Sequence, residues 1–433
     1  MTQKATNFEF TSYKFEPSKR SVVFNYKTEF EDNDPLFFTE TIILPKSINS
    51  SPISEELLEK ILSSLHIIIG ISYYKLYYAT KVSHPYNFSK DETEFWNTIY
   101  KKGLGEFLYK NKLDPKNSPS FSFNINAKPV NYKINNKNKR FLVGIGGGKD
   151  SIVSAELLKN NGQDITGFYV KTGKGSEIID SVVEKIDINQ LKIERHLDWQ
   201  IHQEHLYKGH IPVSAIYAFL GIFLSVIYDY SSLIVSNEHS SNFGNVNYKG
   251  LNINHQWSKS FEFENLFQNY VKKFISPDLF YFSLLRPFYE IRIVKMFSQM
   301  KKYFPYFSSC NNNFKVNSAS QSLWCKNCPK CVFAFTMLSA FLTKNELFKI
   351  FGRNLYQDKS LLPLFEDILG LGEMKPFDCV GTFEESQEAM KLAEKKFKNH
   401  FIIKTLSKKI KSHPETLLVK NESHVPDDLK FLG

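Results

Sequence analysis

A glycine loop between an apolar segment and a helical pattern constrains the fold of this chain more than any other feature. Residues 140–143 predict a short buried strand, and residues 152–159 predict the first turns of a helix, with apolar side chains at helical spacing. Between them, Gly146, Gly147 and Gly148 let the backbone turn sharply and approach a ligand closely, because glycine has no Cβ. The backbone N–H groups of such a turn, next to a helix N-terminus, favour an anionic ligand.

The residues that follow the glycines narrow the kind of loop. Lys149 adds a positive charge, Ser151 a hydroxyl group, and Asp150 a carboxylate that suits Mg²⁺. The loop is not a Walker loop, because Val143 stands at the position of its first glycine and Asp150 at the position of its Ser or Thr. A dinucleotide fingerprint that starts at Gly144 fails at Lys149. An ordinary glycine-rich turn between a strand and a helix is the alternative that binds no ligand.

The loop resembles the Ser-Gly-Gly-x-Asp-Ser loop of the ATP pyrophosphatases (PP-loop enzymes), with Gly146 in place of the leading serine. That family cleaves ATP to AMP and pyrophosphate and attaches AMP to a substrate oxygen. The resemblance implies that Asp150 helps hold Mg²⁺ and that the loop cradles the pyrophosphate leaving group. The ATP-binding residues that it implies are Gly146, Gly147, Gly148, Lys149, Asp150 and Ser151.

The alternation of strand and helix patterns after residue 140 predicts a parallel α/β sheet. The expected strands are residues 141–143, 165–170, 191–197 and 233–236. The expected helices are residues 152–159, 177–186 and 212–228. With the loop resemblance, this predicts a doubly wound PP-loop sheet of the adenine nucleotide alpha hydrolase kind. Ligands of such sheets bind at the carboxyl ends of the strands, an edge of the sheet that we call the mouth. Residues 144–151, 171–173 and 237–245 are expected to lie together there.

Three units are predicted along the chain: an N-terminal α+β domain (1–135), the PP-loop ATP-binding domain with a cysteine site (136–345) and a helical C-terminal region (346–433). In the first unit, residues 21–26 and 37–44 are expected to form hairpin strands. Helices are expected to begin near residue 52 and to cover 92–113, and the polar segment 131–140 reads as a linker. After about residue 255 the chain is expected to be mostly helical, at 261–274, 288–304, 332–342 and 383–397.

Cysteine spacing predicts a metal site. Cys325, Cys328 and Cys331 are separated by two residues each, and Cys310 lies upstream. Four thiolates complete a tetrahedral Zn²⁺ site, so the zinc is expected to be structural; an iron–sulfur cluster or free thiols are the alternatives. Clustered cysteines also indicate a reducing compartment. The fifth cysteine, Cys379, is expected to be a lone buried or surface thiol.

Charge and hydropathy limit the kinds of binding partner and the location that the sequence predicts. The formal net charge of +10 and the pI near 9.0 favour anionic partners. The lysines are spread along the chain rather than gathered in a basic arm, so a nucleic acid is only one candidate partner, and a nucleotide-linked, carboxylated small molecule fits the charge equally well. The first residues contain no apolar signal segment, which predicts a cytoplasmic protein. The apolar run 211–228 approaches membrane length, but Pro212 and Gly221 interrupt it, so a buried core helix is expected rather than a membrane span.

Further polar residues gather after the last predicted strand. Residues 236–245 combine an acid, a histidine and three amides, either as a capped turn or as a site for Mg²⁺ or substrate. Residues 254–260 are similarly rich in donors. Arg286 and Glu290 either form an i,i+4 ion pair on a helix surface, or Arg286 grips a carboxylate or phosphate with two hydrogen bonds.

Short motifs along nearly the whole chain resemble the UDP-N-acetylmuramoyl-L-alanyl-L-glutamate epimerase family. They are residues 70–75 (Gly-Ile-Ser-Tyr-Tyr-Lys), 103–107 (Gly-Leu-Gly-Glu-Phe), 146–151, 236–238, 254–264, 281–287, 308–311, 324–331 and 375–381. Cys379 stands in the last of these motifs. The loop and the cysteine site are also similar to those of 7-cyano-7-deazaguanine synthase.

This resemblance implies an enzyme of peptidoglycan precursor synthesis that inverts the terminal L-glutamate of UDP-MurNAc-L-Ala-L-Glu to D-glutamate and releases AMP and pyrophosphate. It implies ATP, Mg²⁺ and structural Zn²⁺ as cofactors, and coupling to the ligase that adds L-glutamate to UDP-MurNAc-L-Ala. An acyl-adenylate would remove the carboxylate charge beside Cα, and each pKa unit gained there is worth about 1.4 kcal/mol. The catalytic candidates are Lys149, Asp150, Glu238, His239, His255, Lys259 and Glu290. The substrate-binding candidates are Asn237, Lys259 and Arg286.

Two other functions fit parts of the pattern. One is adenylation for nitrogen or sulfur transfer, as in deazaguanine nitrile synthesis or tRNA thiolation. The long region ahead of the loop and the lack of a concentrated basic arm argue against it. The other is a nucleotide-binding module that is stabilised by zinc and has no catalytic activity.

Overall fold

The computed structural model describes residues 4–45, 53–134, 139–172, 176–203, 206–314, 322–418 and 420–430, and places the glycine loop in the parallel part of a mixed sheet. The parallel strands are β5 (Arg140–Gly144), β6 (Asp164–Lys171), β7 (Asn189–His196), β8 (Ser232–Val235) and β11 (Phe280–Ser283). Their order is β11-β8-β5-β6-β7, so the predicted parallel α/β arrangement is confirmed. The strand order reverses between β5 and β8, which is where open sheets of this kind bind ligands.

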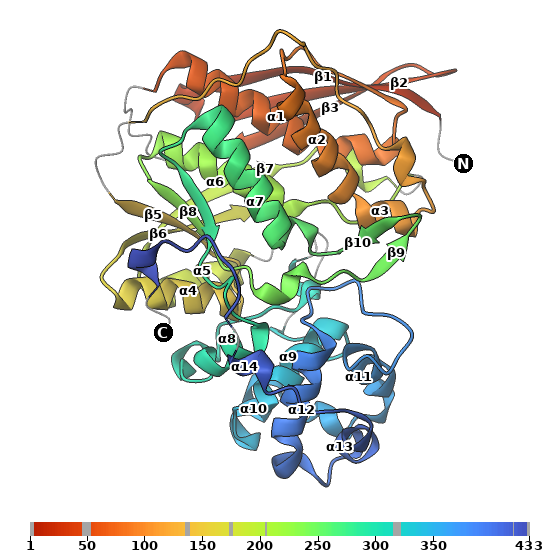
Figure 1. Cartoon of the computed structure of the whole chain (residues 1–433), viewed down its shortest axis with the longest axis vertical. Helices are drawn as coiled ribbons and strands as arrows, with labels where there is room; N and C mark the ends of the chain where they lie inside the picture. Colours follow the sequence, from red (N-terminus) through yellow and green to blue (C-terminus); the bar gives the residue numbers. More distant parts are fainter. Residues whose placement is uncertain are drawn as a thin grey trace.

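Helices cover both faces of this parallel part (Figure 1). After β5 and β6 the chain forms α4 (Lys149–Asn160) and α5 (Ser176–Ile186), which pack on one face. After β7 it crosses to the other face through α6 (Val213–Ile227) and returns to β8 beside β5. The three helices match the predicted ones closely, because their apolar residues recur at helical spacing. The apolar run 211–228 is therefore a buried core helix, as expected.

The sheet continues without a break into the N-terminal part of the chain. Strands β1 (Ala5–Glu16), β2 (Ser21–Phe30), β3 (Leu36–Ile43) and β4 (Lys81–Ser83) give the full order β11-β8-β5-β6-β7-β3-β2-β1-β4 over the described residues. The predicted hairpin is confirmed, since β2 pairs antiparallel with β3 from Ser21↔Ile43 to Thr28↔Leu36. Strand β3 pairs in turn with β7, as in Ile42↔Arg195, so one sheet spans the boundary predicted near residue 135.

Helix α1 (Glu55–Tyr77) packs across the N-terminal strands and begins after the Ser54 cap, whose side chain accepts a hydrogen bond from the Leu57 N–H. Among the described helices it is the one that is long and apolar enough to cross a membrane, and 83 % of its apolar window is buried inside the fold. Such burial is typical of a core helix. The helix predicted over 92–113 is instead two helices, α2 (Lys90–Lys102) and α3 (Gly105–Lys110). They meet at Gly103, where an added Cβ would lie 2.8 Å from Pro212 Cγ.

The region after β8 contains more strand than expected. A small hairpin, β9 (Val246–Tyr248) with β10 (Leu251–Ile253), precedes α7 (Phe261–Tyr270), which ends in a π-helical turn at Val271–Ile275. The expectation that the chain after residue 255 is mostly helical missed β11. The helix predicted at 288–304 is also too long, because α8 (Glu290–Phe297) ends seven residues earlier.

The C-terminal part is helical and packs beside α8, on the side of the molecule where α4 and α5 lie (Figure 1). Its helices are α9 (Pro329–Ser339), α10 (Lys344–Phe351), α11 (Leu362–Ile368), α12 (Phe383–Phe397), α13 (Phe401–Leu406) and α14 (Glu415–Leu418). Helix α9 begins earlier than predicted because Pro329 starts its first turn. Helix α12 has the predicted bounds, and a capping box between Thr382 and Glu385 starts it.

Candidate functional site

The glycine loop joins the carboxyl end of β5 to the N-terminus of α4. Gly147 has a φ of +75°, a conformation that favours glycine, and an added Cβ would lie 3.3 Å from side-chain atoms of Ile178 and Ile179. A Cβ added to Gly146 would meet no atom within 4 Å, so the loop faces open space there. The Ser151 hydroxyl accepts from the Gly146 N–H (3.3 Å) and donates to the Gly148 carbonyl (3.0 Å). The loop is therefore held in part by its own residues and leaves one side open.

Two of the candidate carboxylates share the lysine of the loop. Lys149 Nζ lies 2.7 Å from Asp150 Oδ1 and 2.5 Å from Glu290 Oε1, and both Lys149 and Glu290 are buried. Burial alone would lower the pKa of Lys149, but the two carboxylates raise it well above its usual value. Burial would conversely raise the pKa of Glu290, and Lys149 and Lys330 outweigh that effect and lower it. Lys149 thus stays charged beside the open side of the loop.

Glu238 brings a third carboxylate to the same mouth. It follows β8 at the point where the strand order reverses, and its side chain is buried. Burial, together with the negative charges of Glu290 and Asp150, raises the pKa of Glu238 to about 7. Three acidic groups, Asp150, Glu238 and Glu290, therefore interact at this mouth, and carboxylate oxygens are ligands that a cation such as Mg²⁺ prefers.

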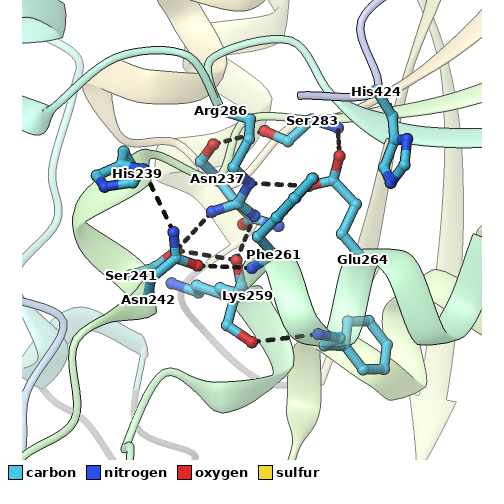
Figure 2. Close-up of polar contacts among 12 residues, drawn as sticks. Asn237, His239, Ser241, Asn242, Lys259, Phe261, Glu264, Ser283, Arg286 and His424 are labelled. Carbon is cyan, nitrogen blue, oxygen red and sulfur yellow. Dashed lines mark hydrogen bonds and ion pairs between the residues drawn. The ribbon is translucent and has the colours of Figure 1, made fainter. Parts of the chain in front are cut away.

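Arg286 organises the loops around this mouth (Figure 2). Its side chain is fully buried, and Nε donates to Glu264 Oε2 at 2.9 Å. The guanidinium also donates to the Glu238 carbonyl (2.6 Å), the Ser241 hydroxyl (3.0 Å) and the Lys259 carbonyl (2.5 Å). It thereby ties the segments after β8 and before α7 to the end of β11. The i,i+4 ion pair that the sequence left open does not form, since Arg286 pairs with Glu264.

Two other candidates lie at the edge of this network (Figure 2). The carbonyl of Asn237 accepts from the Ser283 hydroxyl at 2.5 Å, which joins the ends of β8 and β11. The ring of His239 packs against the rings of Phe243 and Tyr289. Burial and the charge of Arg286 lower the pKa of His239 to about 4, so the imidazole is neutral at physiological pH.

A second cluster, which we call the thiol cluster, consists of Cys379, Lys259, His255 and Glu106. Lys259 Nζ lies 3.3 Å from Cys379 Sγ, His255 interacts electrostatically with the same thiol, and Glu106 contacts His255 Nδ1. Cys379 is a free thiol outside the four-cysteine group, as predicted, but the sequence showed no sign of its charged neighbours. Burial would raise the pKa of this thiol, but Lys259 and His255 outweigh it and lower the pKa to about 6. Cys379 is therefore held as a thiolate between two cations.

The histidine of this cluster is held in its charged form. Burial would lower the pKa of His255, but Cys379 and Glu106 raise it to about 9. The neighbouring ring of His210 lies 4.3 Å from that of His255, centroid to centroid, and burial lowers its pKa to about 3. Sequence reasoning missed Glu106, His210 and the role of Cys379. Glu106 lies in the motif 103–107 and Cys379 in the motif 375–381. These two motifs were the sequence features that could have pointed to a functional role of the two residues.

The four remaining cysteines come together as the spacing predicts. The sulfur atoms of Cys310, Cys325, Cys328 and Cys331 all lie within 4.8 Å of one another, an arrangement that can hold a metal ion such as zinc. Backbone N–H groups of Cys325 and Lys326 point at two of these sulfurs, at 3.5 and 3.4 Å. The segment that carries Cys310 also supports the glycine loop, because the Ser308 N–H donates to the Gly147 carbonyl at 3.1 Å.

Cys328→Ser is expected to remove most of the bound zinc and to lower the melting temperature in the same variant, because metal binding and folding are coupled at such sites. Elemental analysis and thermal melting of the purified protein measure both. Cys379→Ser is the matched control, since this thiol lies outside the four-sulfur group, and its zinc content is expected to equal that of the wild type. An unchanged metal content in Cys328→Ser would contradict the four-thiolate site, and iron instead of zinc would favour the iron–sulfur alternative.

Comparison with known proteins places the chain in a family. Residues 1–284 match the MurL N-terminal domain and residues 306–420 match the MurL C-terminal domain. The UDP-N-acetyl-alpha-D-muramoyl-L-alanyl-L-glutamate epimerase of Salinispora tropica is 34 % identical over 393 residues, covering 89 % of this chain and 84 % of the relative. The protein of that name from Xanthomonas oryzae pv. oryzae is 34 % identical over 337 residues, covering 77 % and 74 %.

A much shorter match is to a protein of another kind. The tRNA-specific 2-thiouridylase MnmA of Hydrogenovibrio crunogenus is 36 % identical over 74 residues, which is 17 % of this chain and 20 % of the relative. This match is too short to compete with the two domains, which cover nearly the whole chain. The resemblance found in the sequence motifs is thus confirmed, and the chain belongs to the MurL family.

Proposed function

We propose that this protein uses ATP to invert the terminal L-glutamate of UDP-MurNAc-L-Ala-L-Glu to D-glutamate in peptidoglycan precursor synthesis. The names of the full-length relatives support the substrate and the inversion. The observation that carries the ATP-dependent part is the group of Lys149, Asp150 and Glu290 beside the open glycine loop. A ligase that attaches L-glutamate to UDP-MurNAc-L-Ala would supply the substrate.

The glycine loop fits the phosphates of ATP, as in the PP-loop enzymes. The open space at Gly146 admits a phosphate oxygen close to the backbone, and the N-terminus of the 12-residue helix α4 points N–H groups at it. Lys149, held charged by its two carboxylates, adds a cation beside the loop. In this proposal residues 146–151 cradle the pyrophosphate that leaves when AMP is transferred. The position of the loop at the reversal of the strand order supports this assignment.

The carboxylates of the mouth fit Mg²⁺. Asp150, Glu238 and Glu290 supply oxygen donors, the ligand type that Mg²⁺ prefers, and burial together with the charges of Glu290 and Asp150 raises the pKa of Glu238. In this proposal Asp150 helps hold the ion, with Glu238 and Glu290 beside it. A bound Mg²⁺ would neutralise charge on the phosphate oxygens during the transfer.

Activation of the glutamate carboxyl group explains why an inversion consumes ATP. Deprotonation at Cα beside a free carboxylate would place two negative charges next to each other. The acyl-adenylate removes the first charge and leaves an electron-withdrawing carbonyl, so the Cα proton becomes more acidic. Water then releases AMP and the inverted amino acid. The net charge of +10 suits a substrate that carries a diphosphate and carboxylates.

The roles of the other candidates follow from their contacts. Arg286 acts as a positioning residue in this proposal, because its hydrogen bonds go to Glu264 and to the loops that carry Glu238 and Lys259. Asn237 similarly holds β8 to β11. Lys259 remains a candidate for contact with the substrate carboxylate, since its ammonium group contacts Cys379 and interacts electrostatically with Glu238.

The test is incubation with UDP-MurNAc-L-Ala-L-Glu, ATP and Mg²⁺ in D₂O, followed by chiral analysis of the glutamate released by hydrolysis. We expect D-glutamate with deuterium at Cα and formation of AMP that depends on the dipeptide substrate. Omission of ATP is the control and is expected to stop the inversion. AMP without inversion would contradict this proposal and favour nitrogen or sulfur transfer. A chain that forms no AMP would fit a nucleotide-binding module without activity.

A further inference from the structure

The thiol cluster is assembled from parts of the chain that are far apart and is held rigidly. Cys379 lies in the segment between α11 and α12, and its carbonyl accepts a hydrogen bond from Lys330 Nζ. The side chain of Asn245 donates to the carbonyl of Pro376 at 2.8 Å, and that of Gln256 donates to the carbonyl of Val380 at 3.2 Å. The segment is therefore fixed on both sides of the thiol by the loops around the mouth.

The arrangement of Cys379, His255 and Glu106 is that of an activated thiolate. Glu106 contacts Nδ1 of the His255 imidazole, and His255 interacts electrostatically with the Cys379 thiol. The His255 backbone N–H is itself held by Asn245 Oδ1 at 2.9 Å. A carboxylate that orients a histidine, which in turn stabilises a thiolate, is an arrangement that prepares cysteine for reaction. A buried structural cysteine needs neither of the two cations that contact this sulfur.

Two lysines link the thiol cluster to the glycine loop. Lys330 contacts the Cys379 carbonyl and lies 3.8 Å from Glu290 Oε1, and Glu290 contacts Lys149 of the loop. Lys259 contacts the Cys379 sulfur and interacts electrostatically with Glu238 and Asp150. The thiolate thus lies at the mouth where the loop would activate a carboxyl group. The carboxylates nearest to the loop are, in contrast, engaged with Lys149.

We propose that the Cys379 thiolate exchanges the Cα proton of the activated glutamate on one face of that carbon. This inference rests on the proposed function. The sulfur takes the proton and becomes S–H, and the C–H electron pair moves to Cα and into the adjoining carbonyl of the acyl-adenylate. A proton from solvent or from an acid on the opposite face then completes the inversion. The S–H returns its proton to solvent before the next turnover, so no oxidant or further reactant is needed.

The position of the cations supports this role. Lys259 and His255 stabilise the sulfur as an anion before it takes the proton. Other charged or titratable groups surround Cys379. Lys330 contacts the Cys379 carbonyl, and Lys375 and Asp378 lie on the same segment as Cys379. Glu106 and His210 lie next to His255. Proton transfer by a positioned side chain contributes typically about 10²–10⁴-fold to a rate.

The test compares wild type, Cys379→Ala and the nearly isosteric Cys379→Ser in D₂O with UDP-MurNAc-L-Ala-L-Glu, ATP and Mg²⁺. Both variants are expected to lose inversion and Cα deuterium incorporation by roughly 100-fold or more. Release of AMP is expected to stay within about tenfold of the wild type, because the glycine loop is untouched. Melting temperatures identify any variant that fails to fold, and Cys379→Ser retains the size of the side chain if Cys379→Ala does not fold.

The outcomes separate this inference from the function on which it rests. A wild type that forms no deuterated D-glutamate would overturn the proposed function itself. Inversion retained above one hundredth of the wild-type rate in a folded variant would overturn the role of Cys379 alone. Parallel loss of AMP release would do the same, because it would place Cys379 in the activation step. A glutamyl adduct on Cys379, detected by intact mass during turnover, would show attack on the carbonyl instead of proton transfer and would also overturn it.

Discussion

Asp150→Ala is expected to abolish the release of AMP and pyrophosphate while the fold persists. Asp150 lies in the first turn of α4, is partly exposed at the mouth and contacts Lys149 Nζ at 2.7 Å. Its proposed task is to help hold Mg²⁺ at the phosphates, where charge develops in the transition state. Loss of such an electrostatic contact typically costs about 10²–10³ in rate or more, roughly 3–4 kcal/mol. Pyrophosphate release under saturating ATP measures it.

Two further variants complete this test. Asp150→Asn keeps the shape of the side chain and removes the charge, and it is expected to lose activity to a similar degree. Asp164→Ala is the control, because this exposed residue lies at the opposite end of the sheet and pairs only loosely with Arg140, at 3.5 Å. It is expected to retain turnover within about twofold, as is usual for a surface ion pair. Full turnover in Asp150→Ala would contradict the assignment of residues 146–151 as the ATP loop.

Arg286→Leu is expected to destabilise the protein by about 3–5 kcal/mol, because it leaves the carboxylate of Glu264 buried without its cation. The substitution also removes the hydrogen bonds that the guanidinium donates to the Glu238 and Lys259 carbonyls. Arg286→Lys is expected to recover only part of this loss, since a single ammonium group cannot reach all four hydrogen-bond partners of the guanidinium. Chemical denaturation followed by fluorescence or circular dichroism measures the free energy of unfolding.

Arg353→Leu provides the matched control for this prediction. Arg353 is also an arginine paired with a carboxylate, at 3.1 Å from Asp358 Oδ2, but its side chain is 45 % exposed. Removal of such a surface pair is expected to change the free energy of unfolding by less than about 1 kcal/mol. Equal changes in the free energy of unfolding for the two substitutions would contradict the prediction. They would show that the buried network of Arg286 stabilises the fold no more than a surface ion pair does.

Most of the parallel sheet could be predicted from the sequence, and two strands show why other parts could not. The alternation of apolar and polar residues in β1 is shifted by irregularities between Ala5 and Asn7 and between Phe10 and Ser12, so the strand lacks a regular period. Strand β11 has only four residues, nearly all buried, and a short apolar run does not distinguish a strand from part of a helix. Both segments form strands because they pair with neighbouring strands of the sheet, β2 for β1 and β8 for β11.

The candidate site divides in a similar way. The residues of the glycine loop and the four-cysteine group could be predicted, because each depends on close spacing in the chain. The thiol cluster could not, since its contacts join residues that are 149 and 120 positions apart. The motifs 103–107 and 375–381 showed that Glu106 and Cys379 belong to a pattern. They did not show that both residues contact the same part of the mouth.

The sequence by itself determined the features that depend on local geometry: the glycine turn before α4, the alternation of strands and helices, and the spacing of the four clustered thiols. Only the tertiary structure decided which charges pair with which, so that Lys149 lies between Asp150 and Glu290, Arg286 binds Glu264, and Cys379 binds Lys259 and His255. The physical reason is the cost of burying a charge. Each buried ionic group must find its partner within the folded core, and that partner is set by packing and not by distance along the chain.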